Sequence, residues 1–209
     1  LSEVYGGDVN GSPISQPFKV NIPGGSPTGQ VFAGILNNFV VSGLTNAGAP
    51  TSAASTFIFA SEVGTITGWN PGVFASPIPP APPPGPSTNA ITAFTATDGA
   101  NYKGLALAKV GTANFLYAAD FHNGKIDGLG CQFQLVTFGA NTFTDPDLPS
   151  GYGPFNVAAI GGKIYVAYAK QDADAEDEVA GKGRGFVSVF EANGHFGGRV
   201  VSRGGLNGP

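Results

Sequence analysis

The sequence is poor in the residue types that carry most recognisable chemistry. It contains one cysteine, Cys131, no methionine and two histidines in 209 residues. A single cysteine excludes an intrachain disulfide and a paired-cysteine metal site. Charged residues make up only 11%, with ten Lys and Arg against fourteen Asp and Glu, so the basic surface that binds a nucleic-acid backbone is missing. No apolar run reaches the roughly 18–20 residues of a membrane-spanning helix. We expect no nucleic-acid partner and no membrane span.

The chain is rich in glycine, with 33 residues, and in short apolar runs. High glycine with low charge disfavours disorder and helix bundles and favours short strands joined by tight turns. The first residues have neither the basic nor the apolar region of a signal peptide, and no Met stands at position 1. A mature chain whose leader has been removed and a piece of a longer protein both account for this.

A pattern of short strands recurs three times. Each copy has a first strand, a second apolar strand with a polar residue at its end, a glycine turn and a third strand. The copies place these strands at 27–32, 57–62 and 64–69, at 102–107, 115–120 and 124–127, and at 154–159, 163–168 and 185–190. With outer strands at 90–94, 133–136 and 199–202, the pattern predicts an all-β chain of the β-propeller type.

The alternative is a β-sandwich or jelly roll, in which strands alternate between an apolar and a wet face. The second strands, at 57–60 and 115–118, are instead apolar on both faces, as expected when each sheet is covered on both sides. Glycines in the first strands fit strands that crowd around a central channel. We expect one propeller domain over 1–209, with the end of a blade at 1–26 and blades at 27–97, 98–149 and 150–209, the last including the lead-in to another blade.

Two segments interrupt this pattern. Residues 43–55 are rich in Gly, Ala, Thr and Ser without periodicity, which predicts a surface loop. Residues 71–89 include the proline-rich run 77–86, which predicts a rigid insertion in polyproline II or irregular conformation rather than a ligand for aromatic grooves. Three blades do not close a ring of four to eight. The remaining blades come from missing sequence, another chain or an oligomer, and we favour missing sequence.

Several segments resemble a family of uncharacterised secreted "conserved hypothetical" proteins, namely 117–127, 143–149, 168–174 and 202–207. The pattern Gly-x-Val-x-Val-Phe-x-x-x-Gly at 185–194 is similar to NHL-repeat blades. The resemblance covers almost the whole chain and implies a six-bladed NHL-like propeller when complete, with an extracellular location. It implies no activity. The proline-rich insertion is longer than the family's, and roughly half the propeller is absent.

Loops after second strands and the starts of first strands share one rim of a propeller channel. This geometry predicts a ligand-binding rim formed by Glu62, Lys103, Asp120, His122, Asn123, Asn156, Lys170 and Asp172. Its oxygen ligands suit Ca²⁺, with Asp120, Asn156 and Asp172 as candidate metal ligands. His122 also allows a transition metal or a general base. In the simpler interpretation, Asp120 and Asn123 stabilise their own turn and Lys103 forms an ordinary ion pair with Glu62 or Asp120.

Other residues have simpler interpretations. The acidic run 172–178 lacks the central glycine and terminal glutamate of an EF-hand, which predicts a solvated loop neutralised by Lys182 and Arg184. Cys131 precedes an apolar outer strand, which predicts a buried, inert thiol. His195 lies in a turn without a second ligand and is expected to be exposed. Asn10-Gly11-Ser12 forms a glycosylation sequon of low specificity.

Two functions remain open. The first is a propeller that binds a small molecule, a glycan or a protein at its rim, around a structural cation. The second is a metal-dependent hydrolase or lyase of lactonase type, in which Ca²⁺ polarises a substrate oxygen and Asp120 or His122 moves protons. The chain contains no serine nucleophile elbow, P-loop or His-Glu-x-x-His motif. We favour binding.

Overall fold

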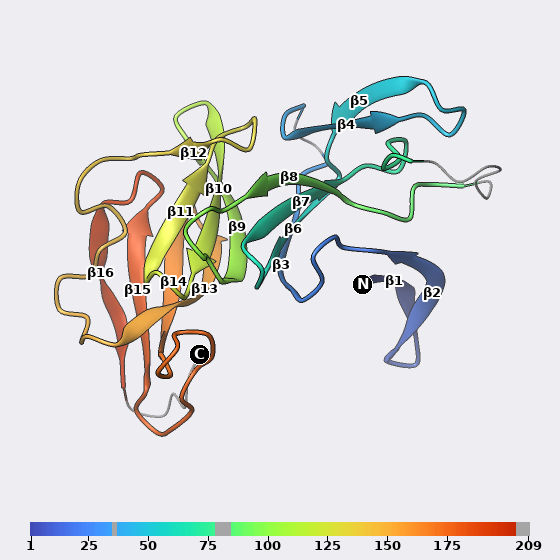
Figure 1. The fold of residues 1–209 in the computed structure, drawn as a ribbon. Helices are drawn as coiled ribbons and strands as arrows, with labels where there is room; N and C mark the ends of the chain where they lie inside the picture. Colours follow the sequence, from blue (N-terminus) through green and yellow to red (C-terminus); the bar gives the residue numbers. More distant parts are fainter. Residues whose placement is uncertain (35–36, 78–84, 204–209) are drawn as a thin grey trace.

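The computed structural model describes residues 1–34, 37–77 and 85–203 and shows an all-β chain (Figure 1). The strands form three four-stranded antiparallel sheets and two two-stranded sheets, none of which closes on itself. Within the described ranges no segment forms a helix with the length and apolar character needed to cross a membrane. The fold is therefore a series of small sheets along the sequence.

Each four-stranded sheet is built from strands in chain order. The first sheet has the order β3-β6-β7-β8, with bounds Pro27–Phe32, Phe57–Ser61, Thr65–Trp69 and Ile91–Thr95. The second contains β9 to β12, with bounds Tyr102–Val110, Ala113–Asp120, Lys125–Leu129 and Leu135–Val136. The third contains β13 to β16, with bounds Tyr152–Ile160, Lys163–Lys170, Gly185–Glu191 and Phe196–Ser202. The strands predicted from the repeat are confirmed in all three sheets.

The first strands of the three sheets pack directly against one another, with β9 between β3 and β13. Glycines make this approach possible. A Cβ atom on Gly29 of β3 would lie 2.6 Å from the backbone N of Leu105 in β9. A Cβ atom on Gly104 of β9 would lie 3.0 Å from the Cα of Asn156 in β13. The expectation that these glycines mark close backbone approach is confirmed.

The same irregularity occurs in each first strand. The ladder with the second strand contains one extra residue, which is Thr28 in β3, Lys103 in β9 and Phe155 in β13. A β-bulge of this kind re-aims side chains and increases local twist. Here each bulge residue reaches a neighbouring sheet: the Thr28 hydroxyl donates to the carbonyl of Tyr102, and the Phe155 ring packs edge-on against Phe121, with 5.3 Å between ring centroids.

The sheets cover one another's faces. One apolar cluster joins the first sheet to the second through residues such as Ile58, Leu105 and Leu116, and another joins the second to the third through Tyr117 and Ile164. Adjacent residues of β10, Leu116 and Tyr117, therefore pack in opposite directions. This explains why the second strands are apolar on both faces.

The N-terminal segment covers the other face of the first sheet. Strands β1 (Ser2–Val9) and β2 (Ser12–Val20) form a separate hairpin rather than part of a four-stranded sheet. Val20, the last residue of β2, and Ile22 just after it are buried against Phe59 and Trp69. Asn10 of the sequon is exposed in the hairpin turn.

Two predictions are wrong. Residues 43–55 are not a loop, because β4 (Val40–Leu44) and β5 (Pro50–Ala54) form a hairpin. Its register is fixed by a turn in which Thr45 binds Ala49 and by backbone pairing of Leu44 with Phe74, a partner distant in sequence.

The second wrong prediction concerns Cys131. This residue is exposed rather than buried, because the chain turns back at Gly130–Gln134 before β12 begins. The core of the proline-rich run, 78–84, and the expected lead-in at 204–209 lie outside the described residues.

A buried ion pair holds the connection between β12 and β13 to the third sheet. Arg199 donates two hydrogen bonds to Asp145, at 2.7 and 2.8 Å, and the Ser188 hydroxyl donates a third at 2.6 Å. Burial alone would raise the pKa of Asp145, but these donors outweigh it and the net shift is downward. The carboxylate form is therefore stabilised by folding.

We expect Gly29→Ala to destabilise the chain by about 1–3 kcal/mol, because the new methyl group would overlap the backbone of β9. Urea unfolding measures this loss. Gly72→Ala is the control, since its Cβ would lie 3.4 Å from Asn70 Oδ1, an ordinary contact. Equal stability of the two variants would show that the close approach of β3 to β9 does not contribute to the stability of the fold.

We expect Asp145→Asn to be less stable than the natural chain at pH 7 and the gap to narrow on acidification. The depressed pKa of Asp145 stabilises the fold above the unfolded value of about 3.9, and this is lost as pH falls through the folded value. Unfolding measured from pH 7 down to about pH 2 tests this. A gap that stays constant with pH would contradict it.

Candidate functional site

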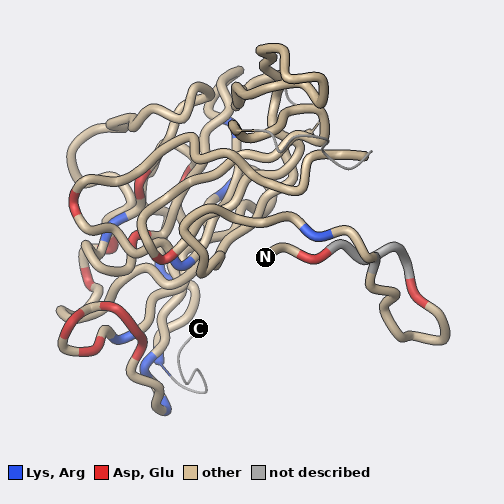
Figure 2. Tube along the Cα trace, turned by 45° about the vertical axis from the view of Figure 1, so that its right-hand side comes forward, with Lys and Arg blue, Asp and Glu red and all other residues tan. Residues whose placement is uncertain are grey.

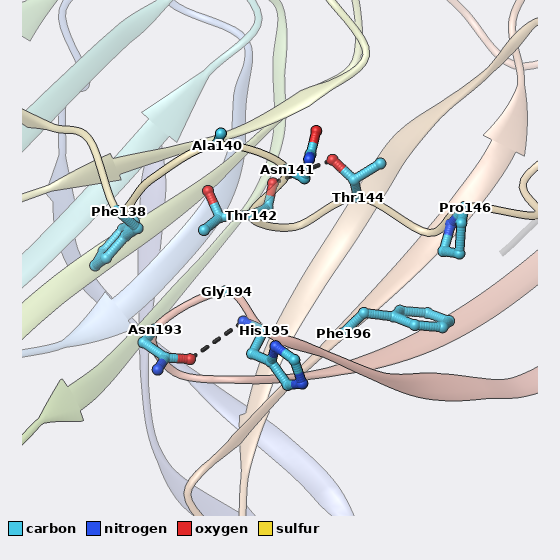
Figure 3. Close-up of a pocket in the computed structure, with 10 residues that line it drawn as sticks. All are labelled: Phe138, Ala140, Asn141, Thr142, Thr144, Pro146, Asn193, Gly194, His195 and Phe196. Atoms are coloured by element: carbon cyan, nitrogen blue, oxygen red, sulfur yellow. Dashed lines mark hydrogen bonds between the residues drawn. The ribbon is translucent and has the colours of Figure 1, made fainter.

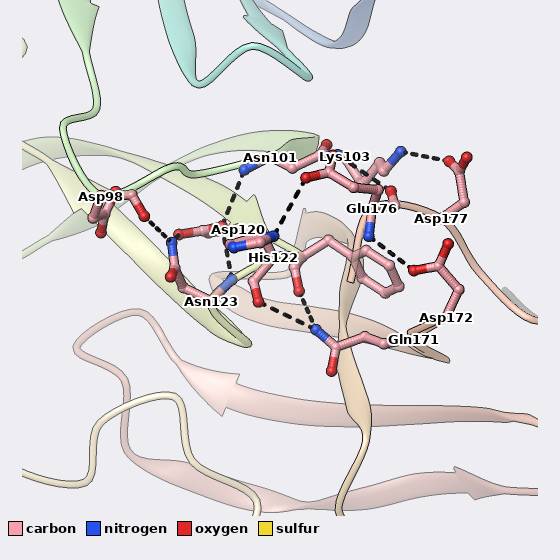
Figure 4. Close-up of polar contacts among 11 residues, drawn as sticks. Asp98, Asn101, Lys103, Asp120, His122, Asn123, Gln171, Asp172, Glu176 and Asp177 are labelled. Carbon is pink, nitrogen blue, oxygen red and sulfur yellow. Dashed lines mark hydrogen bonds and ion pairs between the residues drawn. The ribbon is translucent and has the colours of Figure 1, made fainter. Parts of the chain in front are cut away.

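Polar side chains from all three sheets meet at the edge where the bulges lie, and Figure 4 shows those from the second and third sheets. We call this group the inter-sheet cluster, and it consists of Glu62, Asn101, Lys103, Asp120, His122, Gln171, Glu176 and Asp177. Glu62 follows β6, Asn101 and Lys103 lie at the start of β9, and Asp120 and His122 lie at the end of β10. The other members belong to the loop after β14.

Lys103 is the charged centre of the cluster. The bulge turns its side chain out of β9, and its ammonium group donates to Glu62 at 2.7 Å and to Asp177 at 3.1 Å. The Lys103 side chain is only 5% exposed, whereas Glu62 and Asp177 are 37% and 76% exposed. Burial would lower the pKa of Lys103, but the two carboxylates raise it above its usual value. A single buried cation therefore links the first sheet to the third.

The acidic run 172–178 is largely exposed, as predicted for a solvated loop, and two of its side chains also contact the cluster. Asp172 accepts the backbone N–H of Glu176 at 3.0 Å and closes the loop. Glu176 then accepts from Asn101 Nδ2 at 2.8 Å, and its other oxygen lies 3.4 Å from His122 Nδ1. This run is the most extended stretch of acidic residues along the trace (Figure 2).

The expected neutralisation of this run by Lys182 and Arg184 is wrong. Arg184 donates to the carbonyls of Val179 and Ala180. In the described part of the chain neither basic residue forms an ion pair with the acidic run. Lys103 compensates part of its charge instead.

Asp120 is fully buried and stabilises local backbone. It accepts the backbone N–H groups of Asn101 and Asn123, both at 3.2 Å, and the Asn123 side chain at 2.8 Å. Burial raises the pKa of Asp120 in spite of these donors. Asp120 therefore fixes the turn that presents His122, as the simpler interpretation of Asp120 and Asn123 supposed.

A second charged group lies beside Asp120. Lys125 lies 2.7 Å from Asp98, 2.9 Å from Asp127 and 3.7 Å from Asp120. The hydroxyl of buried Tyr102 donates to Asp127 at 2.8 Å, and burial next to this carboxylate raises the tyrosine pKa. These contacts lie within one sheet, so they brace β9 to β11 and the turn between β10 and β11.

The structure brings together some of the predicted rim residues and not others. Glu62, Lys103, Asp120 and His122 lie in the cluster, with Asn123 beside it. Asp172 stabilises the loop that delivers Glu176 and Asp177. Asn156 is exposed and its amide oxygen accepts the N–H of Val157, while Lys170 is exposed at the end of β14.

Four members of the cluster were not predicted from the sequence as site residues: Asn101, Gln171, Glu176 and Asp177. Glu176 and Asp177 were treated as parts of a solvated run, and Gln171, which donates to the carbonyl of Phe121, precedes that run.

The proposed metal ligands do not form a common site. Asp120 and Asp172 each accept backbone N–H groups of their own turns. Across residues 1–34, 37–77 and 85–203, no three or more His, Cys, Asp or Glu side chains are grouped as metal ligands would be.

One buried polar atom of the cluster, Asn101 Oδ1, has no hydrogen-bond partner within the described ranges, and the buried His122 Nδ1 has only the Glu176 carboxylate, at 3.4 Å. Asn101 as a whole is only 3% exposed. Such unsatisfied atoms cost free energy in a folded chain and call for an explanation. The cluster therefore has hydrogen-bonding capacity that the chain itself does not use.

Two relatives of this chain are uncharacterised proteins of Acanthamoeba polyphaga mimivirus. One is 39% identical over 115 residues, which cover 52% of this chain and 29% of that relative. The other is 33% identical over 159 residues, which cover 73% of this chain and 36% of that relative. The chain thus spans about a third of the length of each. No protein-family model matches it, and no solved structure matches it.

We expect Lys103→Met to destabilise the chain by about 1–2 kcal/mol, because Glu62 and Asp177 lose their buried partner but remain able to contact water. Thermal and urea unfolding measure the loss. Lys163→Met is the matched control, because Lys163 forms an exposed ion pair with Glu191 and its loss should be barely detectable. A loss at position 103 no larger than at position 163 would show that Lys103 does not join the sheets.

Proposed function

We propose that this chain is part of a β-propeller and binds a ligand or partner at the inter-sheet cluster. The propeller proposal is supported by three consecutive sheets with the same strand order, with one bulge in the first half of each first strand. Propeller blades stack in this way, with their first strands nearest a common axis.

The outer face of the third sheet is evidence for the proposal that further blades exist. The face toward the second sheet buries Ile164, Val166 and Phe186, whereas Tyr165, Val187 and Val189 point the other way and are only partly buried. An apolar sheet face of this kind is normally covered. The greater length of the two viral relatives agrees with additional sheets.

The binding proposal rests chiefly on one observation: groups from three sheets converge, and the buried Asn101 Oδ1 among them has no hydrogen-bond partner in the described part of the chain. Asn101 Oδ1 accepts hydrogen bonds, and the partly exposed Glu176 and Asp177 make the surroundings acidic. Such a site favours a ligand with a cationic or hydrogen-bond-donating group, for example an amine. Anionic ligands would be repelled.

The alternative proposal, a lactonase-like hydrolase, assigns Asp120 and His122 to proton transfer beside Ca²⁺. A partly exposed imidazole 3.4 Å from Glu176 supports it. It requires metal binding at the cluster, so Ca²⁺ alone is the probe that separates the two proposals.

We expect titration of the ¹⁵N-labelled chain with tetralysine to shift the amide signals of residues 101–103, 120–124 and 171–178. Glu176→Gln should weaken this binding several-fold, since it removes the charge nearest the unsatisfied atom. Asp147→Asn, an exposed acidic residue outside the cluster, should leave it unchanged. Shifts produced by CaCl₂ and not by tetralysine would favour the hydrolase. If neither probe shifts these amide signals, or if Glu176→Gln binds tetralysine as tightly as the natural chain does, the proposed site is contradicted.

A further inference from the structure

A pocket with a volume of about 630 Å³ lies at the opposite ends of the strands from the inter-sheet cluster. One wall is the segment 138–146, which connects β12 to β13, and the other is the turn 193–196 between β15 and β16 (Figure 3). Ligand sites are commonly clefts of about 300–1,000 Å³. The pocket is thus of a size for a small ligand.

The two walls are held together by the fold itself. The backbone N–H of Phe143 donates to the carbonyl of Gly194 at 2.8 Å. A Cβ atom on Gly194 would lie only 2.6 Å from the Cβ of Thr142, so this approach requires glycine. Asp145, the residue after Thr144, forms the ion pair with Arg199 that fixes the same wall to the third sheet. The pocket is therefore preformed.

Two residues of this wall have a strained backbone. Asn141 and Phe143 have φ values of 60° and 52°, in the left-handed region that non-glycine residues rarely adopt. Strain of this kind persists only where the surroundings impose it, and it is enriched at ligand sites. Here it presents the Asn141 side chain at the pocket.

The lining has a definite chemical character. Half-buried rings of Phe138 and Phe196 lie toward opposite ends of the pocket in Figure 3, with amides, hydroxyls and an imidazole between them. None of the lining residues is Asp, Glu, Lys or Arg. Within the described part of the chain, the Asn141 amide and the His195 ring form no hydrogen bond, so both are available to a ligand.

We propose that this pocket binds a neutral saccharide. A sugar ring carries apolar C–H patches, which can pack on Phe138 and Phe196, and many hydroxyl groups, which can bond the Asn141 amide and the His195 imidazole. The ligand needs hydroxyl groups as well as C–H patches, because a purely apolar ligand would leave these polar side chains unpaired. A charged ligand would find no countercharge. The site is separate from the inter-sheet cluster and does not depend on it.

The test is titration of the ¹⁵N-labelled full chain with neutral oligosaccharides, namely maltohexaose, cellohexaose and tetra-N-acetylchitotetraose. An oligogalacturonate serves as the anionic probe and adenosine as the aromatic probe. We expect at least one neutral oligosaccharide to produce saturable shifts in the amides of 138–146 and 193–196. The signals of 101–103, 120–124 and 171–178 should stay in place, which distinguishes this site from the inter-sheet cluster.

Two variants locate the binding. Asn141→Gly removes the amide while allowing the left-handed backbone, and His195→Ala removes the exposed ring; each should weaken binding about threefold to tenfold. Asn46→Gly, at an exposed position in the β4–β5 turn, should bind as the natural chain does. The dispersed amide spectrum of each variant shows that it is folded. The proposal is overturned if no neutral oligosaccharide binds, if only oligogalacturonate or adenosine binds, or if both pocket variants keep full affinity.

Discussion

The close approach of β3, β9 and β13 is the constraint on which the rest of the structure depends. Gly29 and Gly104 allow backbone to lie against backbone, where any side chain would force the sheets apart. With the first strands fixed in this way, the apolar faces of the later strands meet as layers and exclude water. The second sheet is the central layer, which explains why Leu116 and Tyr117 are both fully buried although they point in opposite directions.

The bulges connect this packing to the candidate site. An extra residue in each first strand directs one side chain toward a neighbouring sheet, and its chemistry differs from copy to copy: a hydroxyl at Thr28, an ammonium at Lys103 and a ring at Phe155. Only the middle copy places a buried charge there. That charge attracts Glu62 from one side and the acidic loop from the other. The bulge that recurs in each first strand thus produces a polar cluster only in β9, where the bulge residue is Lys103.

The two ends of the strands differ in chemistry. The bulge end carries Lys103 and a surplus of carboxylates, so electrostatics would dominate recognition there. The opposite end, between 138–146 and 193–196, is uncharged and aromatic, and its walls are fixed by Gly194 and by the buried Asp145–Arg199 pair. A cationic or hydrogen-bond-donating ligand is therefore proposed for one end and a neutral saccharide for the other, and each site rests on contacts that the other does not use.

The sequence by itself determined the all-β class and the strands of the three sheets, because two-sided apolar strands and glycine turns are local signals that packing reinforces. It also placed Glu62, Lys103, Asp120 and His122 at one edge, since the repeat fixes which strand ends lie together. Tertiary structure alone decided the β4–β5 hairpin, whose small residues show no alternation and whose partner Phe74 is distant in sequence. It also decided the exposure of Cys131 and the folding of Glu176 and Asp177 onto Asn101 and Lys103. All of these features depend on turns and on contacts between segments that are distant in sequence, and neither can be predicted from composition or local pattern.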